Sequence, residues 1–392
     1  MVKIDTIKAL SELKKRYVTD KVSLLVGSGF SKNVWYEFPL WDQLLTDMTQ
    51  ELYKLEAKEA IRKYGYLRIV SEYIKLKGMR ESIEDYIEHR IPYMEKGQFL
   101  LKFVGRDPIP VNKSDFELHK QLLSSRWEKI YTTNYDDLLE FTADIFDLKW
   151  KAISSADNLT LNNETNNLIV KLHGTIYHQD SEKNYTFEFD GNHHHRYIIS
   201  QEDYDNYPKE HEAFTQLMKI SLLQGTFCLI GFSGNDPNYL SWINWVRDVL
   251  IRSSREYDIK NAKVFLIDVS GEEPTTDRQL FYVNHHIIHI SLRDKDVLKI
   301  FGIENNPNIQ NKELINKFLA YLNHDDILAQ ELNVTSKEVY NALWRRNMRV
   351  VDKQMQVSSS DVKDIQDRMT NNRVVTQASS QIYFLSSITT VQ

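Results

Sequence analysis

The chain has 392 residues, of which 42% are hydrophobic and 27% are charged, and its formal net charge is -6. This is the composition of a globular protein with a substantial core, and it lacks the overall basic charge that is typical of nucleic-acid-binding proteins. No apolar run approaches the roughly 18 residues of a membrane span, and the single cysteine excludes a disulfide framework and a four-thiolate zinc site, so we expect a cytoplasmic protein with no membrane segment and no metal.

The first part of the chain combines a helix, a strand and a glycine turn. Residues 4–20 are charged and amphipathic, which predicts a helix, and the apolar run Val22–Val26 predicts a buried strand. In the turn Gly27–Ser31, two glycines would let backbone N–H groups approach a phosphate, although an ordinary tight turn would also explain them. Ser31 could donate to a phosphate or cap the segment that follows. From about residue 42 to 125 the apolar spacing is helical, so we predict a helical insertion.

Two further strand patterns end in polar residues. The first ends in the motif Thr132–Asp136, where Asn134 and Asp136 lie two apart and could face the same way from an extended backbone. Helix capping would explain either residue equally well. The second pattern, Leu168–Leu172, is followed by His173. An imidazole at a strand end is suited to base catalysis near neutral pH, although a lone histidine more often has a structural role.

A later strand pattern ends in the polar turn of residues 231–237, with the sequence GFSGNDP. Ser233 and the neighbouring N–H groups could hold a phosphate at the start of the next helix. Asp236 could instead cap that helix, with Pro237 at its first position. Asp268 ends the next strand pattern, and it could accept a hydrogen bond from a ribose hydroxyl or simply be a solvated loop acid.

Strand patterns that alternate with helical patterns predict an α/β fold, a Rossmann-like, doubly wound and mostly parallel sheet. The strand patterns are Val22–Val26, Ile130–Tyr131, Leu168–Leu172, Phe227–Ile230, Val264–Ile267 and Ile287–Ile290. Residues that follow the carboxyl ends of parallel strands share one edge of such a sheet, where ligands bind, so we expect the polar turns to meet in one pocket.

We predict two domains, residues 1–305 with the sheet and residues 306–392 as a C-terminal, mainly helical interaction region. Residues 325–349 have the apolar spacing of a helix-turn-helix, which is a DNA-binding motif but is also common in protein-interaction modules. Because the chain as a whole is acidic, we expect contact with protein rather than with DNA.

The order and spacing of the polar motifs resemble the sirtuin (silent information regulator two) superfamily over roughly residues 15–300. The resemblance lies in GSGFS at 27–31, TTNYD at 132–136, KLHG at 171–174 and GFSGND at 231–236. In particular, the chain resembles the sirtuin-like, NAD-hydrolysing effector domains of prokaryotic antiphage defence. Protein-deacylating sirtuins usually carry a four-cysteine zinc module between the last two motifs. Here Cys228 is the only cysteine, which argues against a peptide-binding cleft but not against NAD binding.

The resemblance implies a role for each matching residue. Asn134 would contact the nicotinamide ribose and hold an attacking water, Asp136 would shape the nicotinamide pocket, and His173 would be the general base. NAD would be the substrate, and no metal would be needed. The other residues expected to bind NAD are Gly27, Ser28, Gly29, Ser31, Thr133, Gly231, Ser233 and Asp268.

The function that the resemblance implies is an NAD+ glycohydrolase, which releases nicotinamide and ADP-ribose and depletes NAD when infection is sensed. Two alternatives stay open. One is an NAD-dependent protein deacylase or ADP-ribosyltransferase, and the other is a non-catalytic regulator that senses NAD or ADP-ribose or binds DNA. Because an unregulated NAD hydrolase would be toxic, we expect the activity to be gated by assembly into a homo-oligomer, by a partner subunit or by a phage-derived activator.

Overall fold

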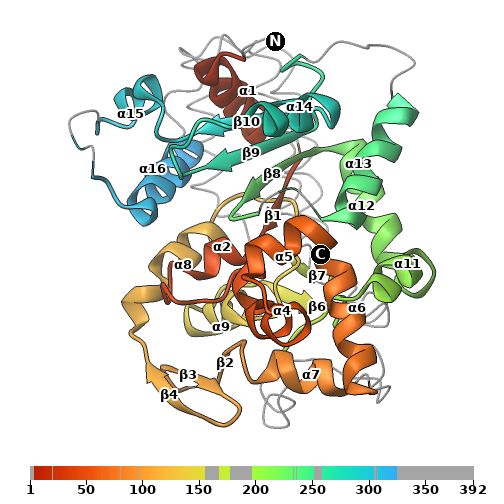
Figure 1. Ribbon diagram of the computed structural model, residues 1–392. Helices are drawn as coiled ribbons and strands as arrows, with labels where there is room; N and C mark the ends of the chain where they lie inside the picture. The colour runs from red at the N-terminus through yellow and green to blue at the C-terminus, as the bar shows by residue number, and fades with distance from the viewer. Residues whose placement is uncertain are drawn as a thin grey trace, which may run out of the picture. The chain divides into compact units, whose positions relative to one another are not determined.

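The structure is a computed structural model, which describes residues 4–19, 21–79, 81–95, 97–154, 167–176, 197–232, 234, 236–250, 258–303, 306 and 308–324. The chain divides into two compact units, residues 1–17 with 21–323, and residues 18–20 with 324–392. Figure 1 labels the helices and strands of the first unit. The predicted helix-turn-helix at 325–349 and the residue Ser233 lie outside the described residues.

A seven-stranded sheet forms the centre of the first unit, in the order β10-β9-β8-β1-β5-β7-β6. Every neighbouring pair of strands is parallel, which confirms the predicted doubly wound α/β fold. The chain runs outward from β1 to β5 and β7 on one side and then returns to β8 on the other, so β1 is the topological switch point. The strands are β1 (Val22–Val26), β5 (Ile130–Thr132), β6 (Lys151–Ile153), β7 (Leu168–Lys171), β8 (Thr226–Ile230), β9 (Val264–Asp268) and β10 (Ile287–Ser291).

All the predicted strands are present, and the edge strand β6 was missed. It is only three residues long and its first two residues are half-buried, so it has no apolar run to reveal it. One face of the sheet is covered by α11, α12 and α13, which run along one side of Figure 1. The helices outside the insertion are α1 (Thr6–Thr19), α9 (Leu138–Ile145), α11 (Gln201–Glu210), α12 (Glu212–Gln224), α13 (Pro237–Leu250), α14 (Thr276–Asn284), α15 (Lys295–Ile300) and α16 (Asn311–Asn323). Among the described residues, no helix is both long enough and apolar enough to cross a membrane.

The insertion between β1 and β5 is mainly helical, as predicted, but it also contains a small antiparallel sheet that was not predicted. Its strands are short, and the third is largely exposed and contains two prolines, so the sequence shows no alternating pattern there. The elements are α2 (Ser28–Ser31), α3 (Trp41–Leu44), α4 (Thr46–Tyr53), α5 (Ala57–Tyr64), α6 (Tyr66–Lys77), α7 (Glu81–Glu88), β2 (Tyr93–Met94), β3 (Leu100–Phe103), β4 (Arg106–Pro110), η1 (Lys113–Phe116) and α8 (Glu117–Leu123).

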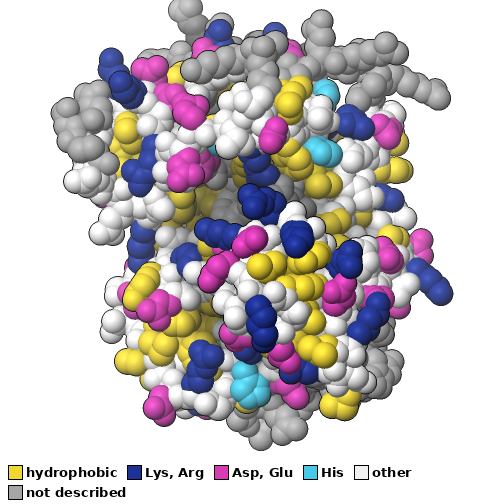
Figure 2. All heavy atoms as spheres, viewed as in Figure 1, with side chains coloured by type: hydrophobic (Ala, Val, Ile, Leu, Met, Phe, Trp, Pro, Cys, Tyr) yellow, Lys and Arg dark blue, Asp and Glu magenta, His cyan; other side chains and the backbone are white. Residues whose placement is uncertain are grey.

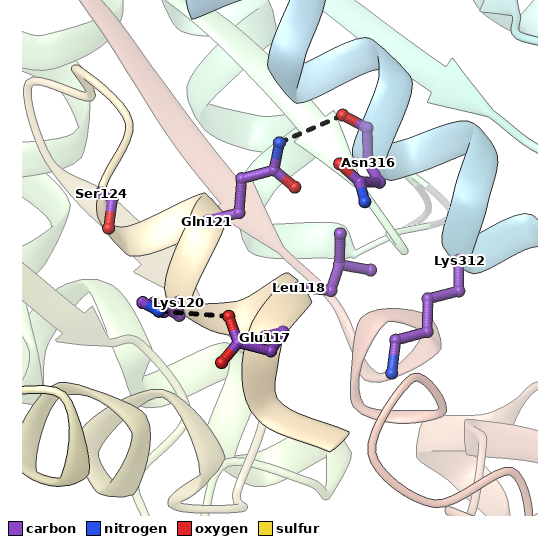
Figure 3. Close-up of a pocket in the computed structure, with 7 residues that line it drawn as sticks. All are labelled: Glu117, Leu118, Lys120, Gln121, Ser124, Lys312 and Asn316. Atoms are coloured by element: carbon purple, nitrogen blue, oxygen red, sulfur yellow. Dashed lines mark hydrogen bonds and ion pairs between the residues drawn. The ribbon is translucent and has the colours of Figure 1, made fainter. Parts of the chain in front are cut away.

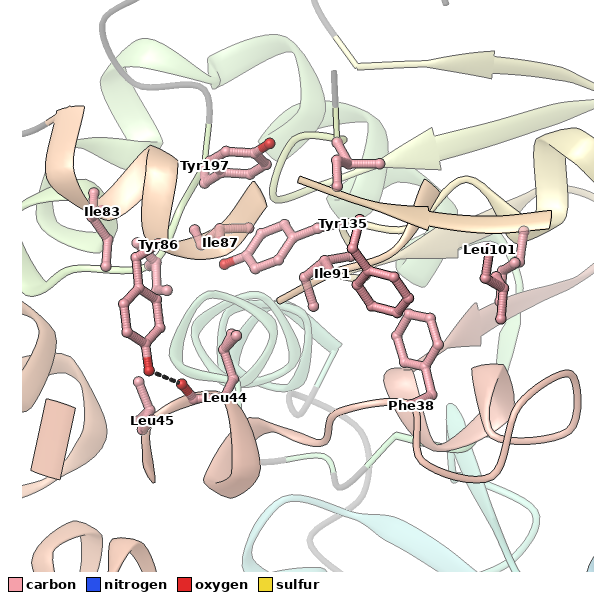
Figure 4. Close-up of a cluster of buried hydrophobic side chains, with 14 of the residues drawn as sticks. Phe38, Leu44, Leu45, Ile83, Tyr86, Ile87, Ile91, Leu101, Tyr135 and Tyr197 are labelled. Carbon is pink, nitrogen blue, oxygen red and sulfur yellow. Dashed lines mark hydrogen bonds between the residues drawn. The ribbon is translucent and has the colours of Figure 1, made fainter. Parts of the chain in front are cut away.

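The insertion has a hydrophobic core of its own, and this core includes a residue of the TTNYD motif. Tyr135 packs among side chains from α3, α7 and β3, and its ring lies 5.0 Å from that of Tyr197 (Figure 4). The Tyr135 hydroxyl donates to Ile198 O at 2.9 Å. The insertion therefore holds the residue next to Asn134 in place.

Candidate functional site

The four sequence motifs leave the same edge of the sheet. Register pairs join Val26 at the end of β1 to Thr132 of β5 and Ile230 of β8, and Thr132 to Lys171 of β7. The structure therefore brings together the turns that follow β1, β5, β7 and β8, at the switch point where doubly wound sheets bind their ligands.

Ser31 links the two polar side chains of the TTNYD motif. Asn134 Nδ2 donates to Ser31 Oγ at 3.1 Å, and Ser31 Oγ donates to Asp136 Oδ2 at 2.9 Å. All three side chains are buried. Asp136 Oδ1 also accepts from Leu138 N, at the start of α9, at 3.2 Å, although the N-cap residue of that helix is Asp137. Asn134 and Asp136 thus both hydrogen-bond to Ser31, as the spacing of the two residues predicted. The proton of the Ser31 hydroxyl is already donated to the Asp136 carboxylate.

A buried lysine supports this loop from β7. Lys171 Nζ donates to Asp136 O and lies 3.0 Å from Glu140 Oε1. Burial raises the pKa of the Asp136 carboxyl, and the nearby Lys171 ammonium opposes the shift. Burial likewise raises the pKa of Glu140. In the sequence, Lys171 was only one residue of the KLHG motif and was given no role. The local sequence does not indicate which backbone carbonyl its long side chain will reach.

His173 follows β7 and is also buried. Its Nε2 lies 3.3 Å from Asp236 Oδ2, but the geometry is not that of a hydrogen bond. Burial lowers the pKa of the imidazole below its ordinary value of 6.5, although the charges of Asp236 and Asp203 oppose this shift. At neutral pH the ring is therefore mainly neutral, which is the form that a general base needs.

The buried polar atoms that have no hydrogen-bond partner among the described residues include both carboxylate oxygens of Glu140, which lies beside Lys171, and the two atoms Asn134 Oδ1 and His173 Nε2. These last two atoms lie at equivalent places, because Asn134 and His173 each come two residues after the register pair Thr132–Lys171 on neighbouring strands. Since buried polar atoms in proteins are nearly always hydrogen-bonded, this pair indicates a place for a polar ligand.

The glycines of the first and last motifs pack backbone against backbone. Gly27 N donates to Ile230 O at 3.0 Å, and Gly29 N donates to Gly231 O at 3.1 Å. A Cβ atom on Gly27 would lie 2.3 Å from Gly231 O, and one on Gly231, which has φ +64°, would lie 2.4 Å from Phe30 N. The two loops can therefore approach this closely only because these residues are glycines. The N–H groups of Gly27 and Gly29 already donate to the backbone oxygens of Ile230 and Gly231.

The other predicted site residues are less closely associated. Ser28 and Thr133 are half-buried, and Gly231 is exposed. Asp268 ends β9, two strands away from β1, and its Oδ2 lies 3.3 Å from His289 Nε2. Burial alone would raise the pKa of Asp268, but hydrogen bonds from His289 and Ser270 bring it below the ordinary value. Asp268 therefore belongs to a polar group of its own, separate from Asn134 and His173.

Sequence reasoning assigned Asp236 only a capping role, and the structure gives it a second one. The capping prediction is confirmed, because Asp236 Oδ1 accepts from Tyr239 N at 2.9 Å. Its other oxygen, Oδ2, accepts from the Tyr204 hydroxyl at 2.7 Å and faces His173. The Asp-Pro pattern was explained by the cap alone, so nothing in the local sequence indicated a second contact with α11.

A surface pocket of about 390 Å³ lies between α8 and α16 (Figure 3). At its edge Lys120 pairs with Glu117 at 3.2 Å, and Gln121 Nε2 donates to Asn316 O at 3.2 Å. None of the predicted site residues lines this pocket, so we give it no part in the candidate site. Within the described ranges, no three His, Cys, Asp or Glu side chains converge in a way that could hold a metal ion.

Replacing Ser31 by alanine should weaken both the fold and the site. The variant leaves buried Asp136 Oδ2 without its donor, which costs about 1–3 kcal/mol of unfolding free energy, and it frees the Asn134 side chain to turn. We expect a lower urea midpoint together with lower turnover of the substrate. Ser125→Ala is the matched control, because this buried hydroxyl donates to Gln121 O away from the site. Equal turnover in the two variants would contradict a positioning role for Ser31.

Comparison with known proteins gives a consistent family. Residues 128–290 match the sequence model of the SIR2-like domain. The chain is 25% identical over 247 residues to Defense-associated sirtuin 2 of Bacillus subtilis, covering 63% of this chain and 21% of that protein. It is 29% identical over 175 residues to NAD(+) hydrolase ThsA of Acinetobacter baumannii, covering 43% and 31%. It is 22% identical over 287 residues to NAD(+) hydrolase ThsA of Bacillus cereus, covering 67% and 51%.

These matches confirm the sirtuin-like character that the motifs predicted, and residues 128–290 are similar to a SIR2-like domain. The chain spans between about a fifth and a half of the length of these relatives. The matched residues begin just before β5 and end within β10, so they include the TTNYD, KLHG and GFSGND motifs.

Proposed function

We propose that the SIR2-like domain of this chain hydrolyses NAD+ at the nicotinamide–ribose bond, and that the protein acts in antiphage defence by depleting NAD. Relatives with the printed names NAD(+) hydrolase and defense-associated sirtuin support this proposal. The observation that carries it is the pair of buried, unpartnered polar atoms, Asn134 Oδ1 and His173 Nε2. A ribose hydroxyl and a water molecule could satisfy both atoms.

The residue types suit this reaction. Loss of nicotinamide leaves an oxocarbenium-like ribose, as in glycoside hydrolysis, and nicotinamide departs as a neutral leaving group. The site therefore needs little acid catalysis, but it must orient the ribose and supply a base for the attacking water. The Asn134 carbonyl oxygen would orient the water or a ribose hydroxyl, and neutral His173 would take up the proton that the water releases. Asp136, fixed by Ser31, would shape the nicotinamide pocket.

The diphosphate of NAD would lie near the turn that follows β1. Ser28 is half-buried there, and the engaged N–H groups of Gly27 and Gly29 hold the turn rigidly against β8. Figure 2 shows a hollow in the middle of the face in view, with Lys and Arg side chains around it together with some Asp and Glu. Lys32 directly follows the turn after β1, and its positive charge would favour a diphosphate.

The proposed base makes the reaction sensitive to pH. As the pH falls through the pKa of His173, the imidazole gains a proton and can no longer act as a base, so the rate should fall. Because burial lowers this pKa below 6.5, we expect the acid limb of kcat/KM for NAD+ to have its midpoint below 6.5. A rate profile measured between pH 4.5 and pH 9 at constant ionic strength, about the range in which histidines titrate, checks this. A midpoint above 6.5 would contradict a buried imidazole base.

Product analysis tests the proposed function. The purified protein is incubated with NAD+, with and without candidate activators, and the products are separated by chromatography. Equal amounts of nicotinamide and ADP-ribose are expected. Nicotinamide with a modified protein acceptor would instead indicate a deacylase or an ADP-ribosyltransferase. Unchanged NAD+ that stays bound would indicate a non-catalytic sensor.

We also propose that the protein acts in the cytoplasm, as a gated homo-oligomer. Gating is expected because continuous NAD hydrolysis would kill the cell. A second copy is a reasonable partner for α12 and α13, because Ile220, Trp245 and Val249 are large apolar side chains with exposed surface there. The activator would be a partner subunit or a phage-derived molecule.

A further inference from the structure

Three side chains from different elements lie next to one another: His173 after β7, Asp236 before α13 and Tyr204 of α11. His173 Nε2 faces Asp236 Oδ2 at 3.3 Å, and the same oxygen accepts from the Tyr204 hydroxyl at 2.7 Å. The Tyr204 ring also meets the His173 ring edge to face, with 5.4 Å between centroids.

The Tyr204 hydroxyl has a single proton and donates it to Asp236 Oδ2. Each donor draws negative charge from its acceptor. Asp236 Oδ2 therefore faces the imidazole with part of its charge taken up by Tyr204. The strength of the Asp236–His173 interaction then depends on Tyr204, a residue of α11.

We propose that Asp236 is the positioning residue of His173, and that Tyr204 adjusts the negative charge that Asp236 presents to the imidazole. This inference rests on the proposed function in one respect, because it takes His173 as the base in NAD hydrolysis.

Other groups around His173 do not explain the same arrangement. Asp203 acts on His173 through its charge, but its Oδ2 accepts from Ile199 N and Ser200 N at the start of α11. Tyr207 lies 6.3 Å from the His173 ring centroid, and its hydroxyl donates to Leu172 O at 2.9 Å. Among the described residues, Asp236 alone brings a carboxylate oxygen within ion-pair distance of the imidazole.

The proposal predicts shifts of opposite sign in two variants. Asp236→Asn removes the charge that favours the imidazolium ion, so the pKa of His173 should fall and the acid limb of kcat/KM should move to lower pH. Turnover at the plateau should fall about 10–100-fold, as when a group that orients a functional histidine is removed, with little change in KM. Tyr204→Phe returns the full charge of Oδ2 to His173, so its acid limb should move to higher pH.

The test uses two readouts on the whole chain. One is the pH profile of NAD+ hydrolysis, and the other is NMR titration of ¹³C-labelled histidine rings, with the His173 signal assigned by its loss in His173→Gln. The matched control is Tyr17→Phe, because the Tyr17 hydroxyl is also largely buried and bonds to Asn323 and Arg126 N, away from the site. This control should lower the melting temperature without moving the His173 titration.

Opposite shifts of the His173 titration in Asp236→Asn and Tyr204→Phe would support the proposal. Unchanged titration in both variants, or shifts of the same sign, would overturn it even if the wild-type protein hydrolyses NAD+. If the wild-type protein hydrolyses no NAD+ but the NMR shifts have the expected signs, the proposed function fails and the Asp236–His173 pairing stands. Should Asp236→Asn fail to fold, Tyr204→Phe alone decides, because a shift to lower pH or no shift contradicts the proposal.

Discussion

Replacing His173 or Asn134 by alanine is expected to reduce NAD+ hydrolysis by about 10²–10⁴-fold, down to an undetectable rate. The first variant removes the proposed base, and the second removes the amide whose free oxygen would hold the water or the ribose. Each side chain is buried just after the end of its strand. A side chain on the surface therefore cannot take over its role. Steady-state release of nicotinamide by each variant, with the activator that the wild-type protein needs, measures the loss.

A buried histidine outside the site separates loss of catalysis from loss of stability. His119 is fully buried between Phe30 and Phe116, and burial lowers its pKa to about 3. His119→Ala should therefore destabilise the protein by leaving a cavity, yet keep a wild-type rate below its melting temperature. If His173→Ala keeps a wild-type rate under the same conditions, the assignment of the base is wrong.

Replacing Gly231 by alanine should be the most damaging change to the fold near the site. The new Cβ would lie 2.4 Å from Phe30 N, and the backbone there has φ +64°, which alanine adopts only with strain. Left-handed strain costs about 1–2 kcal/mol and overpacking about 1–3 kcal/mol, so we expect a loss of roughly 2–5 kcal/mol. Urea unfolding measures it. Because the β8 turn would be pushed away from the Gly27 turn, turnover should fall as well.

Gly78→Ala is the control that measures only the cost of the left-handed backbone conformation. Gly78 ends α6 with φ +77°, and a Cβ there would meet nothing within 4 Å. Gly78→Ala should therefore lose only the strain, about 1–2 kcal/mol, and keep its activity. If Gly231→Ala is no less stable than Gly78→Ala, the two turns are not packed as described.

Local patterns predicted the sheet well because each long buried strand has its own apolar run. Val22–Val26 and Thr226–Ile230 are buried at every residue, as expected for the centre of a parallel sheet. Strand β6 and the small sheet of the insertion were missed because their short, partly exposed segments carry no such run. Their pairing depends on neighbours that are distant in the sequence.

The sequence predicted those residues of the candidate site that directly follow a strand. Asn134, Asp136 and His173 all follow strand ends, and the structure brings Asn134 and Asp136 onto one serine, Ser31. Tyr204 lies in the middle of a polar helix, and only the tertiary fold brings it to Asp236. The roles of these residues in NAD hydrolysis stay predictions.

The sequence could not show which of two causes explains the glycines of the first motif. Two glycines after a strand are typical of a phosphate-binding turn, and they are equally typical of close backbone packing. The structure provides the second reason directly, because Gly27 and Gly231 lie against each other's backbones. Both reasons can hold together, since a turn fixed in this way could still present Ser28 to a diphosphate.

A crystal structure of the His173→Ala variant with NAD+ tests the site most directly, because the substrate should remain intact in it. We expect the C1 atom of the nicotinamide ribose to lie beside Asn134 Oδ1, facing the space that the imidazole leaves, with the diphosphate near Ser28. NAD+ bound elsewhere on the chain, with Asn134 Oδ1 far from the ribose, would contradict the proposed site.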